Sequence, residues 1–141
     1  MFFRVLVVTL LSVPCLADTT VAVFKPISGV CTGNLKITHS VDSSGEYFCF
    51  QGPYIRPYSE RTDDGITNRI KVGTVKAASK FIALTDTTET GPNFIRFHNH
   101  WVAGAAFGDN FYNYAFSGDK LQSTIWSANT SQQVCVYQKI Q

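Results

Sequence analysis

The chain has 141 residues, a formal net charge of +2 and 16% charged residues. It carries no basic stripe, so nucleic acid and anionic membranes are excluded as expected partners. With 45% hydrophobic and 13% aromatic residues, its composition is that of a folded chain rather than a disordered one.

Residues 1–17 (MFFRVLVVTLLSVPCLA) combine a positive charge at Arg4 with an apolar run, and they end on small residues before Asp18. This pattern is typical of a secretory signal peptide, and the segment is too short to be a membrane span. We therefore expect a single secreted domain over residues 18–141, with no membrane span, in an oxidising extracellular compartment.

The remainder of the chain is typical of an all-β protein. Short runs rich in β-branched and aromatic residues alternate with turn signals, and no segment has a convincing helical period. Residues 42–45 and 117–119 have the composition of hairpin turns. The pattern predicts an antiparallel β-sandwich or barrel with strands over residues 19–25, 34–40, 46–51, 68–75, 80–86, 93–101, 110–116, 121–127 and 133–140.

One long loop, residues 52–65, contains aromatic residues at positions where burial is not expected. Tyr54 and Tyr58, with Arg56 between them, are therefore the candidate ligand-binding residues. Aromatic rings beside polar side chains can stack on a sugar ring and hydrogen-bond its hydroxyls, so a glycan is one possible ligand. Asn129 begins an Asn-Thr-Ser sequon in a polar context and is the predicted glycosylation site.

Of the four cysteines, Cys15 lies in the predicted signal peptide, so three remain in the mature chain. An odd number implies one internal disulfide and a leftover thiol or an intermolecular bond. Three pairings are open, and Cys31 with Cys49 closes the shortest loop, worth about 3 kcal/mol on loop-closure grounds. Cys135 would then be either a buried free thiol or the link of a disulfide-bonded homodimer.

The sequence contains no clear catalytic or metal-binding constellation. If residues 93–101 form a strand, His98 and His100 lie on the same face. No acidic residue lies beside them in the sequence, and a zinc or copper site needs three or four ligands. The chain also lacks a G-x-S-x-G elbow and a glycine-rich phosphate loop. We predict a protein that is not an enzyme and that holds neither a metal nor another cofactor.

Aromatic residues are dense between residues 101 and 126. Strand alternation places Phe111 and Asn113 on one face, and Tyr112 and Tyr114 on the other. Most of the aromatic side chains in this segment are expected to lie in the core.

Residues 30–34 (VCTGN) and 45–50 (GEYFCF) resemble a segment of the N-terminal domain of coronavirus spike proteins, especially those of alphacoronaviruses. Residues 72–84 and 127–135 are similar to later strands of that domain, so the resemblance covers short patches of residues 30–135. In that family the two cysteines of the first motifs are bonded, which implies a Cys31–Cys49 disulfide. The family's domain is a galectin-like β-sandwich that binds host glycans or proteins.

The resemblance implies a free-standing, secreted viral accessory glycoprotein that engages a host glycan or protein in attachment or immune modulation. Ala77 stands where the family usually has proline, and the receptor-binding, fusion and membrane segments are missing. The alternative is a secreted lectin-like or immunoglobulin-like module of a cellular organism. An immunoglobulin domain would need a wider spacing than that of Cys31 and Cys49, with a tryptophan between them.

Overall fold

A computed structural model describes residues 21–31, 33–52, 60–61, 67–128 and 130–141 of the chain. The prediction of an all-β antiparallel fold is confirmed, since the described residues form strands and turns without a helix. The strands are β1 (Val21–Gly29), β2 (Leu35–Asp42), β3 (Gly45–Gln51), β4 (Glu60–Arg61), β5 (Thr67–Lys71), β6 (Gly73–Ala78), β7 (Ala83–Gly91), β8 (Phe94–Ala103), β9 (Ala106–Ser117), β10 (Lys120–Ser127) and β11 (Thr130–Lys139).

All of these strands belong to one sheet, in the order β4-β5-β3-β2-β1-β11-β10-β9-β8-β7-β6. Strands that follow one another in the chain are mostly neighbours in the sheet, and the first strand pairs with the last. Only Val72 separates β5 from β6, although β6 is the last strand of the sheet order and β5 is the second from the other end. The sheet must therefore coil until its two ends approach each other, which makes it a nearly closed up-and-down barrel.

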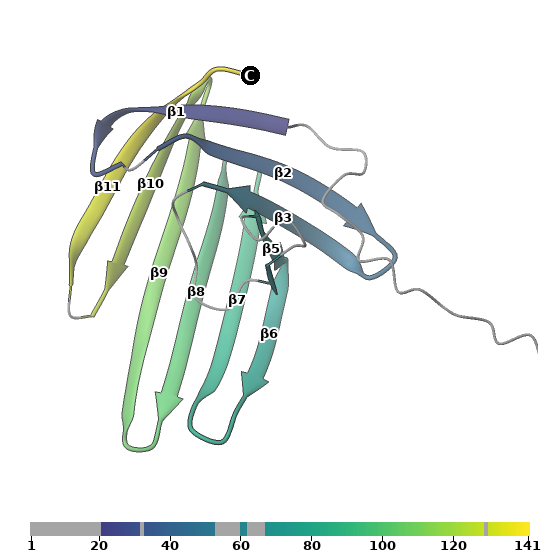
Figure 1. Cartoon of the computed structure of the whole chain (residues 1–141), viewed down its shortest axis with the longest axis vertical. Coiled ribbons are helices and arrows are strands. Elements are labelled where there is room, and N and C mark those ends of the chain that lie inside the picture. Colours follow the sequence, from purple (N-terminus) through teal and green to yellow (C-terminus); the bar gives the residue numbers. More distant parts are fainter. Residues whose placement is uncertain (1–20, 32, 53–59, 62–66, 129) are drawn as a thin grey trace, which may run out of the picture.

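Coiling places β1, β2 and β3 across the long strands β8 to β11 (Figure 1). Phe50 on β3 contacts Phe97 on β8 and Tyr114 on β9, with ring centroids 5.5 and 5.1 Å apart. The core therefore lies between two layers that are halves of the same sheet. Its buried members are Phe24, Leu35, Ile37, Phe48, Phe50, Ile70, Ile95, Phe97, Tyr112, Tyr114, Leu121, Cys135 and Tyr137.

The two predicted hairpin turns are present. The backbone N–H of Ser44 donates to Asp42 Oδ1 at 2.7 Å, and Gly45 has a φ of 142°. This Asx-type turn joins β2 to β3, and the turn at Gly118 (φ 60°) joins β9 to β10. The single strand predicted over residues 68–75 is wrong, because the chain breaks there into β5 and β6.

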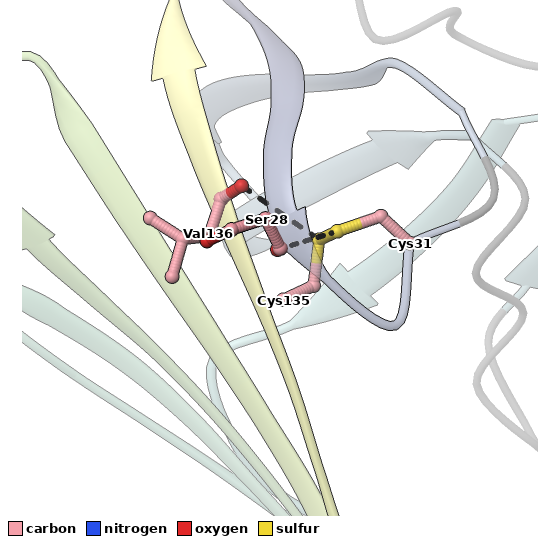
Figure 2. Close-up of a disulfide and its surroundings, with 4 residues drawn as sticks. All are labelled: Ser28, Cys31, Cys135 and Val136. Carbon is pink, nitrogen blue, oxygen red and sulfur yellow. Dashed lines mark hydrogen bonds between the residues drawn. A yellow bond between two sulfur atoms is a disulfide. The ribbon is translucent and has the colours of Figure 1, made fainter.

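The predicted Cys31–Cys49 disulfide is wrong: Cys31 is bonded to Cys135 (Figure 2). The two Cα atoms lie 5.4 Å apart, within the usual range for a disulfide. Cys49 is on β3, which β2 separates from β1 in the sheet. Two strand spacings amount to about 10 Å, so Cys49 is out of reach of a cysteine beside the end of β1.

The pairing of β1 with β11 brings the bonded cysteines together. Gly29 lies opposite Cys135, and the N–H of Val30 donates to the carbonyl of Val134 at 2.9 Å. Gly29 has a φ of +90°, and a Cβ there would lie 2.1 Å from the Val134 oxygen. This close approach requires glycine two residues before Cys31.

The prediction that Cys135 is a free thiol or an interchain link is also wrong, because its sulfur is already bonded to Cys31 within the same chain. Cys135 is 3% exposed and belongs to the core. Cys49 is 2% exposed and is not a free thiol either. The bond joins residues that are 104 positions apart, so it ties the first described strand to the last.

Candidate functional site

The candidate site lies on the outer face of the sheet, on strands β7 to β10. Along β8, side chains alternate between the core, which takes Ile95, Phe97 and Asn99, and the opposite face. Arg96 and His98 are therefore on the outer face. In-register pairing extends the same alternation to the neighbouring strands β7 and β9.

Three rings on this face stand in a row across adjacent strands. His98 lies opposite Phe111, which lies opposite Trp126. The ring centroids of His98 and Phe111 are 4.6 Å apart with planes at 4°, and those of Phe111 and Trp126 are 5.3 Å apart at 14°. These separations match the spacing of about 4.8 Å between strands, so each ring stands above its own strand.

A cavity of about 460 Å³ runs beside these rings. Its volume falls in the range of small-molecule binding sites. The side chains of Phe97 and Tyr112 belong to the core, so these residues can line it only with their backbone. We call this cavity the outer groove, and its lining residues are Thr87, Glu89, Arg96, Phe97, His98, Phe111, Tyr112, Asn113 and Trp126.

Polar side chains form the second wall of the outer groove. Arg96 lies opposite Glu89 on β7 and opposite Asn113 on β9. Its Nε donates to Asn113 Oδ1 at 3.2 Å, and its guanidinium lies 4.4 Å from the ring centroid of Phe94. Contacts with Asn113 and Phe94 thus hold Arg96 on two sides. The donors of its guanidinium lie beside the acceptors of Glu89 and Asn113 in the groove.

The prediction that His98 and His100 share a face is confirmed, and the fold brings beside them an acidic residue that is not their neighbour in the sequence. Asp109 of β9 accepts hydrogen bonds from His98 Nε2 at 2.7 Å and from His100 Nδ1 at 3.0 Å. Since a carboxylate only accepts, both ring nitrogens carry the proton. These bonds, first that of His98 and then that of His100, hold the pKa of the Asp109 carboxyl below its ordinary value.

A single carboxylate oxygen holds the histidine pair. In the described parts of the chain, no group of three or more His, Cys, Asp or Glu side chains is placed to hold a metal ion. Both imidazoles are bonded to the same Asp109 oxygen. The third histidine, His39, bonds to Glu46 at 2.7 Å on the β2–β3 hairpin.

Replacing Asp109 with Asn should destabilise the protein only where the carboxylate is charged. Because the pKa of Asp109 is lower in the folded state, the carboxylate stabilises the fold at pH values above its unfolded-state pKa, which is near 3.9. This stability is lost as the pH falls through the folded-state pKa. We expect the variant to lose less than about 1 kcal/mol above pH 5, because partly exposed ion pairs are weak.

The measurement is chemical unfolding of the wild type and Asp109→Asn at a series of pH values. The difference in unfolding free energy should shrink as the pH falls below about 4 and vanish once the pH is below the folded-state pKa of the carboxyl, where it is protonated in both states. A difference that grows as the pH falls below 4 would show that Asp109 does not act as a carboxylate acceptor.

The remaining predicted site residues lie outside the described residues. This holds for Tyr54, Arg56 and Tyr58 of the long loop and for Asn129 of the sequon. Their assignment to ligand binding and to glycosylation therefore stays a prediction.

Sequence reasoning did not identify the outer groove. Trp126 belongs to the aromatic residues of which most are expected in the core, and the sequence does not single out Arg96 or Glu89. The alternation that places Phe111 and Asn113 on one face was the available signal. It could not show that His98 and Trp126 flank Phe111, because that requires the register of three strands.

The fold and the groove together define an all-β antiparallel protein with a ligand-sized groove on the outside of a coiled sheet. No family model matches the chain. No curated protein matches it either. Similar solved structures include secretory abundant heat soluble protein 4 from Ramazzottius varieornatus, at 14% identity and a TM-score of 0.48 over 84% of this chain and 93% of that chain.

Two further observations bear on location. The Cys31–Cys135 disulfide is consistent with an extracellular location, because such bonds persist in oxidising compartments. Among the described segments, none is an apolar helix of the length needed to cross a membrane.

Proposed function

We propose that this chain is a secreted, non-enzymatic binding protein that engages a glycan or a protein on a cell surface through the outer groove. The predicted signal peptide over residues 1–17 and the disulfide support secretion. In this proposal Asn129 carries a glycan, and the mature chain begins at Asp18. Binding of this kind requires neither a nucleophile nor a cofactor.

The observation that carries the proposal is the combination of lining groups in the outer groove. Trp126 and Phe111 supply apolar surface, and Arg96 and Asn113 supply directed hydrogen bonds beside it. Binding sites typically join an apolar lining with a few fixed polar groups, and Trp and Arg are enriched among the residues that dominate binding energy.

The kind of organism follows from the resemblance to coronavirus spike N-terminal domains. On that basis the protein is a viral accessory glycoprotein that acts on a host surface or immune ligand. A secreted lectin-like or immunoglobulin-like module of a cellular organism is the alternative. Both have the same consequence for the groove, which is that its ligand lies outside the cell.

Replacing Trp126 with Ala should weaken binding to cells about 30-fold, because a central aromatic contact is worth about 2 kcal/mol. The measurement is flow cytometry of the labelled, secreted protein on a panel of cultured animal cells. Phe107→Ala is the matched control, since Phe107 is 71% exposed on β9 and does not line the groove.

The control variant should bind as the wild type does, and both variants should keep the wild-type melting temperature. Equal binding by wild type and Trp126→Ala, with both proteins folded, would contradict the proposed site.

A further inference from the structure

The outer groove is close to neutral in charge. Its lining carries one carboxylate, Glu89, and one guanidinium, Arg96, which lie directly opposite each other on β7 and β8. Cross-strand neighbours on one face have Cβ atoms about 4.5–5.5 Å apart, so their charges offset each other locally. His98, the other titratable group of the lining, faces Asp109. An anionic ligand would meet Glu89, and a cationic one would meet Arg96.

Hydrogen-bonding capacity in the groove is of both kinds. Arg96 only donates, Glu89 only accepts, and the amide of Asn113 and the hydroxyl of Thr87 do both. A ligand that satisfies this set must itself present many groups that donate and accept. Sugar hydroxyls have this property, while a lipid chain or an apolar side chain would leave these polar groups unpaired at a cost.

The aromatic wall suits the remaining surface of a sugar. Pyranose rings carry C–H groups that pack against aromatic carbon, and the stacked row of His98, Phe111 and Trp126 presents the edges of its rings along the groove. The lining extends from Thr87 on β7 to Trp126 on β10, so it crosses four strands. At about 4.8 Å between strands this is a span of roughly 14 Å.

An extended peptide is a poorer occupant. Peptides usually bind to sheets by adding a strand at an edge, where backbone N–H and C=O groups are free. Strands β7, β8, β9 and β10 are all interior strands with a neighbour on each side. The groove therefore offers side chains but no free strand edge.

We propose that the outer groove binds an uncharged sugar, such as a hexose or N-acetylhexosamine unit within a glycan; this inference rests on the proposed function. The ring edges of Trp126 and Phe111 contact the C–H surface of the sugar, and Arg96, Glu89 and Asn113 bond to its hydroxyls.

The test is a glycan array that presents neutral oligosaccharides, each beside its sialylated and sulfated derivative, followed by calorimetric titration of the best neutral ligand. The wild type should bind neutral glycans, Trp126→Ala should bind them at least about 10-fold more weakly, and Phe107→Ala should bind as the wild type. Preferential binding of the sialylated or sulfated derivatives would overturn the inference.

Glu89→Gln provides a second variant at an exposed strand position, where folding is not at risk. It removes one charge and keeps an acceptor. A neutral sugar should bind this variant equally or more weakly, because a charged acceptor makes the stronger hydrogen bond. A marked gain in the affinity of Glu89→Gln for the sialylated or sulfated derivatives, above that of the wild type for neutral glycans, would show that the groove prefers an anion and would overturn the inference.

Failure of the inference is distinguishable from failure of the proposed function. Cell binding that requires Trp126 and is abolished by periodate oxidation of cell-surface glycans supports both. Cell binding that requires Trp126 but survives periodate overturns the sugar and leaves the groove as a protein-binding site. If Trp126→Ala keeps both cell binding and glycan binding, the inference and the proposed function are both overturned.

Discussion

Replacing Cys31 and Cys135 together with Ser should lower the free energy of unfolding by about 2–5 kcal/mol. The bond closes a loop between residues 104 positions apart, and loop-closure entropy for about 100 residues is near 4.7 kcal/mol. The loss of unfolding free energy lies in the upper part of this range if the buried groups around Cys135, which is 3% exposed, cannot hydrogen-bond the two new serine hydroxyls.

Chemical unfolding without reductant measures this loss, and peptide mapping of the wild type supplies the control. A non-reducing digest should contain a linked peptide pair with Cys31 and Cys135. Recovery of a pair linked through Cys31 and Cys49, or a double variant as stable as the wild type, would contradict the assigned bond.

Replacing Leu121 with Ala should cost about 2–5 kcal/mol, the range for a fully buried leucine. Leu121 is 0% exposed and belongs to the core between the two halves of the sheet. The change removes apolar contacts and leaves a cavity that the interior of the coiled sheet cannot fill without moving several strands.

Lys120→Ala is the matched control for this variant, because Lys120 is the exposed residue next to Leu121 on β10. It should change stability by less than about 0.5 kcal/mol. Urea unfolding of both variants makes the comparison. If Leu121→Ala were as mild as Lys120→Ala, the position of β10 against the core would be wrong.

Local patterns predicted most of the strands. Alternation and turn composition located β2, β3, β8, β9 and β10 to within a few residues, and turns of recognisable composition separate β2 from β3 and β9 from β10. The turn at residues 42–45 is an example, since an Asp side chain and a glycine are enough to form it.

The break at Val72 was not predictable in the same way. Ile70, Lys71 and Val72 alternate, and the β-branched residues Thr74 and Val75 follow directly after Gly73, so the local composition is that of one strand. Gly73, with a φ of +107°, allows the change of direction, but the change is required by the closure of the whole sheet. Closure depends on pairing between the two ends of the chain, which no short segment encodes.

The disulfide and the outer groove share this non-local origin. Cys31 is closer in sequence to Cys49 than to Cys135, and only the pairing of β1 with β11 reverses that preference. The contact of Asp109 with His98 and His100 was not predicted, because it forms only when the β8–β9 hairpin pairs the two strands. Shared faces within one strand were predictable, whereas contacts between strands required the register.

The most direct test of the outer groove as the binding site is hydroxyl-radical footprinting of the protein free and bound to cells, read by mass spectrometry. Bound protein should show lower modification of Trp126 and Phe111 and unchanged modification of Phe81 and Phe107, which are 78% and 71% exposed outside the groove. Protection of Phe81 and Phe107 with no change at Trp126 and Phe111 would place the binding surface elsewhere and contradict the account.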